Sequence, residues 1–481
     1  MGKIRTRYAP SPTGYFHVGG ARTALFNYLY AKHNNGDFIV RIEDTDIERN
    51  VENGIDSQLD NLNWLGIKID ESIRKPGDYG PYIQSEKLER YKTLAHQLVN
   101  KGKAYYCFCS KEELERNRAQ SLSSGSTPKY NRHCLYLSQE EITQKLKDNI
   151  PHVIRLKMKD NIEIEWDDLI RGKITIPTSS LTDPTILKSN GIAMYNFAVV
   201  IDDHDMNISH VIRGEEHISN TPYQIAIKRA LGFDLKEIKY GHLSVIVNEQ
   251  GKKLSKRDKT LKQFIQDYQD MGFYPHAVTN FLALLGWAPP KKEIMSMQEM
   301  INDFELLTVS KAPTFFDFKK MMWVSNEYFK KMDEYEYLKF VDKYININFG
   351  ELISRKRDIL LLFKNQISYA SQLNELVTET LLSFSLFKLN EETMNLVNSE
   401  RWLQTISSFK KFISESNNEI SFDQAKEIIS KVKQETFNNG KDLFMPIRIS
   451  ITSIEHGPEL NKIISILGKQ EILKRLKNER N

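Results

Sequence analysis

The N-terminal segment alternates between strand-like and helix-like patterns of apolar side chains. Residues 4–8 and 38–42 are predicted as short strands. Between them, apolar residues at three- and four-residue spacing predict a helix that ends at Asn34-Asn35-Gly36, since Asn and Gly tolerate the left-handed conformation. Pro10 and Pro12 exclude a helix from the loop after the first strand. This order predicts a βαβ unit whose loop lies at the carboxyl edge of a parallel sheet, where ligands of such sheets bind.

The frequency of helix-breaking residues changes partway along the chain. Residues 1–330 contain 13 of the 15 prolines and 19 of the 23 glycines, and strand-like and helix-like runs alternate there. Residues 331–481 hold few breakers and show helical spacing of apolar residues, as at Phe409, Phe412 and Ile413. The pattern predicts an α/β part with a parallel sheet, followed by a mainly α-helical part.

Composition and charge narrow the class of protein. The 481 residues are 40% hydrophobic and 27% charged, which excludes a mainly disordered or fibrous chain. Uncharged apolar stretches are too short for a membrane span, and the charged N-terminus lacks the apolar core of a secretory signal. Only three cysteines are present, so we expect a reducing, cytoplasmic location. A net charge of +4 argues against a protein that coats DNA, yet it allows one basic groove for a folded nucleic acid.

Two segments carry residues suited to polyphosphate binding. In PSPTGYFHVGG (residues 10–20), glycines let backbone N–H groups approach an anion at the start of a helix, and His17 can donate to phosphate oxygens. In GKKLSKRDK (residues 251–259), five basic residues suit a polyphosphate whose charge grows as pyrophosphate departs. Taken singly, each segment is better explained as an ordinary turn or a solvated basic loop.

Together, these segments resemble the HIGH and KMSKS signatures of class I aminoacyl-tRNA synthetases, in the same order. The segments APSPTGYFHVGGARTALFNYLYA, FIVRIEDTD and YNFAVVIDDHDMNISHVIRGEEHISNTPYQ are similar to those of bacterial glutamyl-tRNA synthetases. The resemblance implies a Rossmann-type catalytic domain at residues 1–105 and 190–245, with an inserted α/β domain at 106–189 that binds the acceptor end of tRNA. It also implies a helical connection domain at 246–330 and an α-helical anticodon-binding domain at 331–481.

The resemblance implies a two-step reaction without a covalent enzyme nucleophile. Glutamate and ATP, with Mg²⁺, form glutamyl-adenylate and pyrophosphate, and glutamate then passes to the 3′-terminal adenosine of tRNA(Glu). His17 and Lys256 match the catalytic positions, and Lys256 would stabilise the triphosphate as the α-phosphate is attacked. The positions that match the ATP site are Pro10, Gly14, His17, Gly19, Gly20, Lys253, Ser255, Lys256 and Arg257.

The charge of the implied substrate provides a check on these assignments. Glutamate has two carboxylates and one ammonium, so its pocket needs cations and an anion. Arg7 and Arg213 match family positions that hold the carboxylates, a task that suits guanidinium groups, and Glu43 matches the position that receives the ammonium. The remaining matching positions are Ala9, Ser11 and Tyr195. Val199 departs from the pattern, because some family members carry asparagine there.

The three cysteines lie close enough in sequence to share one task. Cys107-Phe108-Cys109 is followed after 24 residues by Cys134, and in a reducing compartment thiolates so spaced most often bind zinc. Some family members carry Cys-x-Cys, 24 residues and Cys-x-His here, and Tyr136 stands in place of that histidine. Tyr130, at the spacing of a related tRNA-modifying paralogue, and His133 are further candidates for a fourth ligand. Buried cysteines without a metal are the alternative.

One acidic cluster and several rival functions share parts of this pattern. Asp202-Asp203-His204-Asp205 is similar to a metal site, but the resemblance places it on a strand end near the pocket and without metal. Glutaminyl-tRNA synthetase is the nearest rival, although the Ala-Pro-Ser-Pro-Thr-Gly of residues 9–14 favours glutamate. The glutamyl-queuosine paralogue lacks an anticodon-binding domain, and a non-catalytic tRNA-binding descendant need not keep His17 or Lys256. The resemblance implies a monomer and leaves open whether tRNA(Gln) is also charged.

Overall fold

The computed structural model describes residues 2–46, 48, 50–123, 129–233, 238–254, 262–384, 397 and 399–478. Their contacts divide the chain into two compact units. The first unit comprises Met1–Tyr268 with Val278–Phe318, and the second comprises Gln269–Ala277 with Lys319–Asn481. None of the helices described is long and apolar enough to cross a membrane.

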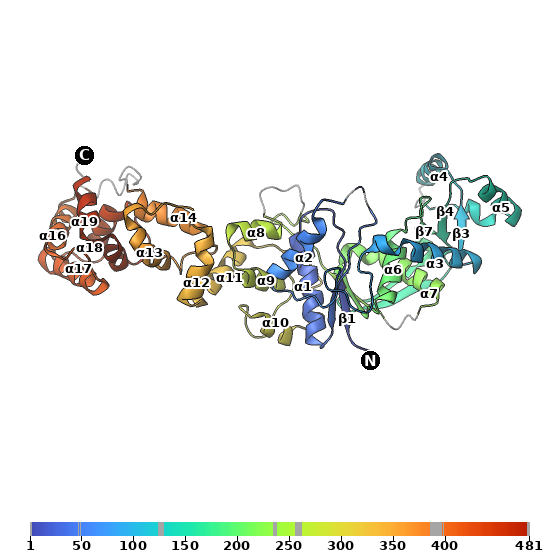
Figure 1. The fold of residues 1–481 in the computed structure, drawn as a ribbon, viewed down its shortest axis with the longest axis horizontal. Helices are drawn as coiled ribbons and strands as arrows, with labels where there is room; N and C mark the ends of the chain where they lie inside the picture. The colour runs from blue at the N-terminus through green and yellow to red at the C-terminus, as the bar shows by residue number, and fades with distance from the viewer. Residues whose placement is uncertain are drawn as a thin grey trace. The chain divides into compact units, whose positions relative to one another are not determined.

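A six-stranded sheet forms the centre of the first unit (Figure 1). Its strands follow the order β2-β1-β8-β9-β5-β6, and all neighbours run parallel except β5 and β6. Their bounds are β1 Arg5–Tyr8, β2 Asp37–Val40, β5 Glu163–Asp168, β6 Gly172–Pro177, β8 His210–Gly214 and β9 Lys239–Leu243. Because β1 and β8 are parallel neighbours, the carboxyl ends of these two strands meet at one edge of the sheet.

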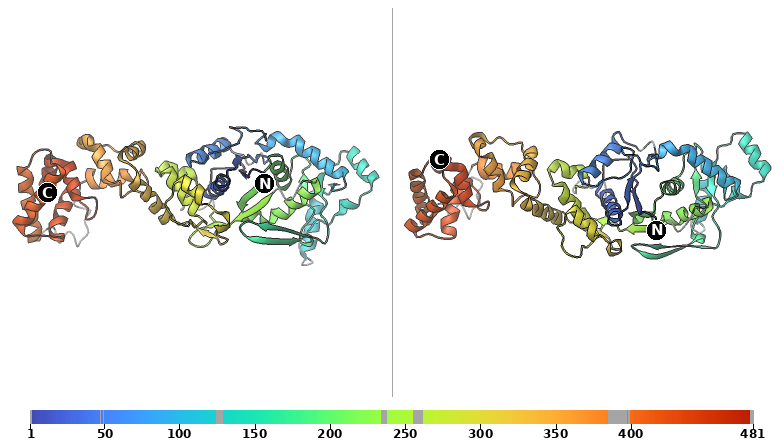
Figure 2. Two further views of the ribbon diagram at one scale, coloured as in Figure 1. Left: turned by 90° about the horizontal axis from the view of Figure 1, so that it is seen from below. Right: turned by 60° about the horizontal axis from the view of Figure 1, so that its bottom comes forward.

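Helices cover both faces of this sheet (Figures 1 and 2). Helix α1 (Val18–His33) packs on the face to which Phe38 of β2 points, and the Phe38 ring meets Tyr28 of α1 edge-on. The next residue, Ile39, points to the opposite face and joins the apolar core of helices α3, α6 and α7. These helices span Leu88–Asn100, Tyr195–Asp205 and Thr221–Leu231. The sheet is therefore a buried parallel sheet of the α/β type, as predicted.

The N-terminal βαβ unit is confirmed. Strands β1 and β2 occupy the two predicted strand positions, and α1 between them ends at His33. The helix is closed by Asn34, and Asn35 takes the left-handed conformation with φ of 54°.

The segment expected to form one inserted domain is divided between two sheets. Strands β3 (Ala104–Cys107), β4 (Val153–Leu156) and β7 (Thr185–Leu187) form a separate antiparallel sheet. Helices α4 (Lys111–Ser123) and α5 (Gln139–Lys147) belong to the same segment. Strands β5 and β6, in contrast, extend the central sheet beside β9, so part of residues 106–189 belongs to the central sheet.

The remaining elements of the first unit are short. Strands β10 (Ile246–Val247) and β11 (Thr314–Phe315) pair in parallel. The helices are α2 Gly54–Trp64 and α10 Met297–Asp303, together with α8 Ile265–Met271 and α9 Pro275–Leu284, which are divided between the two units. Residues 269–277 pass into the second unit, so the segment expected to be one connection domain, 246–330, contributes to both units.

The second unit consists of helices among its described residues. They are α11 Phe318–Lys331, α12 Glu334–Val341, α13 Lys356–Leu362, α14 Gln372–Val377, α16 Glu400–Glu415, α17 Phe422–Thr436, α18 Lys441–Thr452 and α19 Leu460–Asn478. One apolar core runs through them and includes Phe363, Phe409 and Ile463, all fully buried. The mainly α-helical character predicted for residues 331–481 is confirmed.

Candidate active site

A pocket of about 440 Å³ lies at the carboxyl ends of β1 and β8. All six residues expected to bind glutamate line it, as do three of those expected to bind ATP. These residues are Arg7, Ala9, Ser11, Glu43, Tyr195 and Arg213, together with Pro10, Gly19 and Gly20. The fold thus brings together side chains that are about 200 positions apart in the sequence.

The start of α1 is shaped by its N-cap residue His17 and by Gly20 in its first turn. The His17 Nδ1 atom accepts the Gly19 backbone N–H at 3.0 Å and caps the helix, so the ring hydrogen lies on Nε2, which is 2.8 Å from Gln263 Oε1. A side chain at Gly20 would place its Cβ 2.6 Å from the Tyr8 hydroxyl oxygen, so any residue other than glycine would force Tyr8 to shift. No acidic residue occupies the first turn of α1, which leaves its positive N-terminal end uncompensated by side chains of the helix. His17 itself is not among the pocket-lining residues.

Arg7 belongs to a buried network of ion pairs. Its Nε and Nη2 atoms donate to the two carboxylate oxygens of Asp203 at 3.1 and 3.3 Å. Asp203 also accepts from Arg41 Nη1 at 2.7 Å, and Arg41 Nη2 donates to Glu43 Oε1 at 3.0 Å. Arg41 therefore connects the cation and the anion that line the pocket, although it is fully buried and does not itself reach the pocket.

Glu43 is an anion whose charge is only partly compensated. Burial raises the pKa of Glu43, while the neighbouring guanidinium groups of Arg41 and Arg7 oppose that rise. An ammonium group entering the pocket would stabilise the carboxylate further. The residue is thus suited to receive a cation.

Arg213 presents one unused donor group. Its Nε atom lies 3.3 Å from His242 Nε2, and its Nη2 atom donates to Thr221 Oγ1 at 2.8 Å. The Nη1 atom is buried and has no hydrogen-bond partner among the described residues. Because a buried, unpaired guanidinium nitrogen is costly, an anion at this point would stabilise the site.

Three further pocket-lining side chains, those of Tyr195, His217 and Asn220, are polar and lie close to one another. Tyr195 stands at the N-terminus of α6, and its hydroxyl oxygen is 3.3 Å from His217 Nδ1. Asn220 Nδ2 lies 3.1 Å from the same nitrogen. Burial lowers the pKa of His217 to about 4, so the imidazole is neutral at pH 7 and Nδ1 can accept a hydrogen bond.

The basic loop is described only in part. Lys253 Nζ lies 3.8 Å from Glu216 Oε1, and Glu216 lines the pocket. The expected ATP-site residues Ser255, Lys256 and Arg257 lie outside the described residues.

The acidic cluster was expected at the end of a strand, and this placement is wrong. Residues 202–205 form the last turn of helix α6. Asp202 accepts hydrogen bonds from Gln84 and Tyr91 and pairs with Lys87 at 2.7 Å, while Asp203 pairs with Arg7 and Arg41. Asp202 and Asp203 are therefore ion-paired with protein cations.

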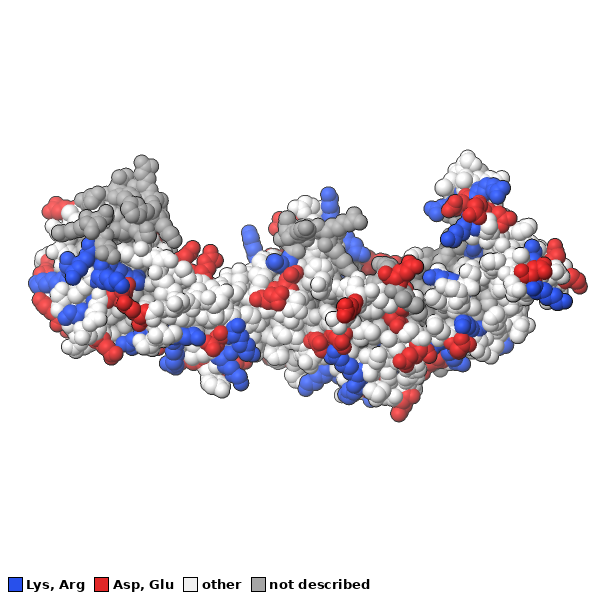
Figure 3. Space-filling model, turned by 45° about the horizontal axis from the view of Figure 1, so that its top comes forward, with Lys and Arg blue, Asp and Glu red and all other residues white. Residues whose placement is uncertain are grey.

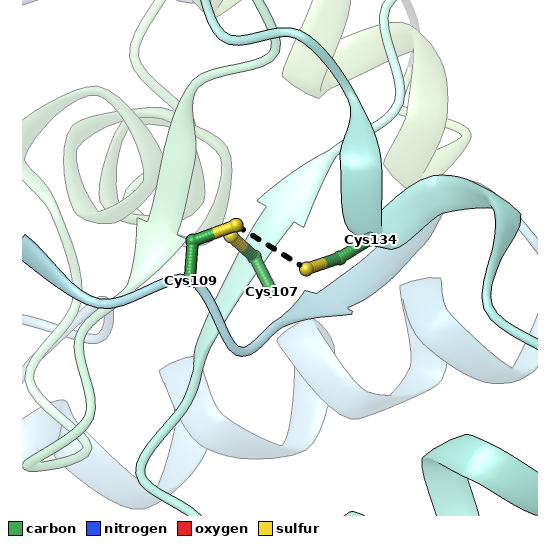
Figure 4. A group of neighbouring side chains, drawn as sticks. All are labelled: Cys107, Cys109 and Cys134. Carbon is green, nitrogen blue, oxygen red and sulfur yellow. Dashed lines mark hydrogen bonds between the residues drawn. The ribbon is translucent and has the colours of Figure 1, made fainter. Parts of the chain in front are cut away.

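The three cysteines converge on one point (Figure 4). Their Sγ atoms lie within 4.8 Å of one another, and Cys109 and Cys134 are 3.5 Å apart. The Tyr130 hydroxyl oxygen lies 3.3 Å from Cys107 Sγ and 3.6 Å from Cys109 Sγ. Of the candidates for a fourth ligand, Tyr136 is 79% exposed, whereas the Tyr130 hydroxyl lies beside the thiols.

Hydrogen bonding between the thiols shifts their pKa values in opposite directions. A hydrogen bond from Cys134 lowers the pKa of Cys107 to about 4, and the same contact raises the pKa of Cys134. The hydrogen bond therefore favours the thiolate form of Cys107. Across the chain as described, this is the only group of three or more His, Cys, Asp or Glu side chains that could hold a metal.

Several residues of the site were not found by sequence reasoning. They are Arg41, which joins Arg7 to Glu43 through Asp203, and His242 and Asp168, which lie behind Arg213. Arg41 stands two positions before Glu43 in the segment FIVRIEDTD, and a charged residue at the end of a buried strand is the signal that could have found it.

Comparisons with known proteins agree with this geometry. The chain matches the family described as "tRNA synthetases class I (E and Q), catalytic domain" over residues 3–323, and "Anticodon binding domain" over residues 319–479. The glutamate–tRNA ligase of Malacoplasma penetrans is 56% identical, with 99% of this chain and 97% of that protein covered. The glutamate–tRNA ligase of Ureaplasma parvum is 55% identical, with 99% and 98% covered.

The solved structures give the same result for the fold. A glutamate tRNA ligase from Elizabethkingia meningosepticum, in complex with its amino acid, matches with a TM-score of 0.89 at 33% identity, and 99% of both chains is covered. The α/β catalytic part and the helical C-terminal part are both included in this match. The chain therefore belongs to the class I tRNA synthetases of the glutamate and glutamine group, and within that group to the glutamate–tRNA ligases.

Proposed function

We propose that the pocket binds L-glutamate, with Arg7 and Arg213 holding its carboxylates and Glu43 receiving its ammonium. The observation that carries the proposal is the combination of two arginines and one carboxylate in a single pocket of about 440 Å³. Arg213 Nη1 is unpaired among the residues described, and the ion pair of Arg7 with Asp203 uses Nε and Nη2 rather than Nη1. Ala9, Ser11 and Tyr195 complete the pocket.

ATP, with Mg²⁺, is the second substrate, and we place its phosphates at the start of α1. Pro10, Gly14, His17, Gly19 and Gly20 belong to this loop and helix start, where backbone N–H groups and the helix dipole favour anions. His17 would exchange its contact with Gln263 for a phosphate oxygen. Lys253, Ser255, Lys256 and Arg257 would stabilise the triphosphate as the glutamate carboxylate attacks the α-phosphate and pyrophosphate leaves.

The macromolecular substrate of the reaction is tRNA. Residues 319–479 match an anticodon-binding domain, so we propose that the second unit reads the anticodon of tRNA(Glu) on unstacked bases.

On the face drawn in Figure 3, basic side chains alternate with acidic ones, which is consistent with the small net charge of +4. We propose that the protein acts as a monomer in the cytoplasm. Charging purified tRNA(Glu) and tRNA(Gln) with labelled glutamate decides whether one or both are substrates.

Glutamate-dependent ATP–pyrophosphate exchange in the presence of tRNA(Glu) tests the two substrate sites separately. For Arg213→Gln we expect the glutamate KM to rise about 100-fold, because a charge-assisted hydrogen bond to a carboxylate is lost. The exposed Arg90→Gln is the matched control and should leave that KM unchanged. For Lys256→Ala we expect exchange to fall at least about 100-fold, or about 2.7 kcal/mol of transition-state stabilisation. A normal glutamate KM in Arg213→Gln would refute the glutamate site.

We further propose that Cys107, Cys109 and Cys134 bind a structural zinc ion, with Tyr130 as the fourth group. Tetrahedral Zn–S bonds of about 2.3 Å require sulfur atoms roughly 3.8 Å apart, so three thiols within 4.8 Å fit this ion. The metal would fix the inserted segment, with its sheet β3-β4-β7, which we propose meets the acceptor end of tRNA. Metal analysis of the purified protein tests this, and less than about one zinc per ten chains would end the proposal.

A further inference from the structure

A buried acid–histidine pair lies behind Arg213. Asp168 is the last residue of β5, and His242 belongs to the neighbouring strand β9. The side chains of both residues are 0% exposed, and Asp168 Oδ2 lies 2.5 Å from His242 Nδ1. Two titratable groups without any exposed surface are costly unless they are fully hydrogen-bonded, so this pair needs an explanation.

The contacts of Asp168 determine where the histidine carries its hydrogen. The Oδ1 atom of Asp168 accepts backbone N–H groups from Ile170, Arg171 and His242 at 3.1, 3.0 and 3.2 Å. Although burial opposes it, the hydrogen bond from His242 lowers the pKa of Asp168. The carboxylate is therefore ionised and acts only as an acceptor, so His242 Nδ1 carries a hydrogen and donates it.

The other ring nitrogen of His242 then faces Arg213 as an acceptor. Arg213 and His242 are paired residues of the parallel strands β8 and β9, and Arg213 Nε lies 3.3 Å from His242 Nε2. Thr221 Oγ1 accepts from Arg213 Nη2 at 2.8 Å. These two contacts fix the plane of the guanidinium and leave Nη1, which has no partner in the described part of the chain.

We infer that Asp168 and His242 are positioning residues, which hold the Arg213 guanidinium in the one orientation that offers Nη1 to a glutamate carboxylate. Asp168 selects the ring tautomer, and the tautomer makes Nε2 an acceptor for the Arg213 N–H. Neither residue lines the pocket, so neither touches the substrate. The inference rests on the proposed glutamate site and adds to it the residues that set its geometry.

Asp168→Asn tests the inference with almost no change in volume. Its Oδ1 can still accept the backbone N–H groups, but its amide would donate to His242 Nδ1 and drive the hydrogen to Nε2, where it meets the Arg213 N–H. We expect the glutamate KM in tRNA charging to rise about tenfold, with the ATP KM unchanged. The ¹⁵N NMR spectrum of His242 should report the change of tautomer independently of activity.

Two histidine variants separate positioning from packing. His242→Asn keeps a donor near Asp168 and removes the acceptor for Arg213, so it should raise the glutamate KM as Asp168→Asn does. The side-chain oxygen of His242→Gln can again accept from Arg213, so this variant should raise the glutamate KM less. His210→Asn, which changes another buried histidine on the adjacent strand β8, is the matched control and should leave the glutamate KM unchanged.

Each result decides for or against the positioning role. An unchanged glutamate KM in a folded Asp168→Asn protein, or an equal rise in the glutamate and ATP KM values, would overturn the inference. An equal effect of His210→Asn would do the same, because it would indicate general loosening of the sheet. If Asp168→Asn does not fold, the contrast between His242→Asn and His242→Gln decides. If the glutamate KM rises in Arg213→Gln but not in Asp168→Asn, only the positioning role of Asp168 and His242 is rejected. If the glutamate KM is unchanged in Arg213→Gln, the glutamate site itself is rejected.

Discussion

Replacing Arg41 with glutamine should destabilise the first unit far more than removal of a surface arginine. Arg41 is fully buried and pairs with Asp203 at 2.7 Å, Glu43 at 3.0 Å and Asp202 at 3.6 Å. Although burial opposes ionisation, these carboxylates raise the pKa of Arg41. Without Arg41, the cations still paired with these carboxylates among the described residues would be Arg7 and Lys87, and breaking such a buried pair costs about 3–5 kcal/mol.

Arg74 is the control for this experiment. It also pairs with two carboxylates, Asp56 and Asp60, each at 2.5 Å, but its side chain is 46% exposed and theirs are 60% and 67% exposed. Solvent screens such pairs, so Arg74→Gln should cost less than about 1 kcal/mol. Urea unfolding followed by tryptophan fluorescence measures both variants, since Trp166 and Trp287 lie buried in the first unit. Equal losses in the two variants would refute the reasoning that burial makes the Arg41 network costly to break.

Three further perturbations test other parts of the molecule. Gly20→Ala should lower the free energy of unfolding by about 1–3 kcal/mol, because the new Cβ would lie 2.6 Å from the Tyr8 hydroxyl, and adding Tyr8→Phe should restore part of the loss. Burial lowers the pKa of His210 to about 4, below its value of about 6.5 in the unfolded chain. The contribution of neutral His210 to the free energy of unfolding is therefore fully present above pH 6.5, and it is lost toward pH 4 by up to about 1.4 kcal/mol per pH unit. His210→Asn should make the free energy of unfolding less dependent on pH in this range, as measured by urea titrations at a series of pH values. Tyr130→Phe should weaken zinc binding in competition with a chelator, whereas the exposed Tyr136→Phe should leave the affinity unchanged.

The elements near the N-terminus were predictable because local signals there agree with one another. Prolines, a helical apolar face and a terminal Asn-Asn-Gly all indicate the same βαβ unit, and the structure contains it. The pocket residues were found through motifs that resemble a known family, and all six expected glutamate-binding residues line one pocket. Arg7 and Arg213 are brought together by the pairing of β1 with β8, which no local pattern in the sequence specifies.

The features missed from the sequence depend on contacts between distant segments. Arg41 and Asp203 are separated by 162 positions, and only the packing of α6 on the sheet brings them to 2.7 Å. The β-branched run Val199-Val200-Ile201 favours a strand, yet it forms part of the buried helix α6, because its packing in the core outweighs its intrinsic propensity. Asp168 lay in a segment expected to be an inserted domain, so its place beside His242 in the central sheet was not foreseeable.

A crystal structure of the protein with bound L-glutamate tests the central claim most directly. We expect one carboxylate oxygen within about 2.7–3.2 Å of Arg213 Nη1, the other carboxylate beside Arg7, and the ammonium group in contact with Glu43. Glutamate bound away from these three residues, or bound with its ammonium group toward the arginines, would contradict the account.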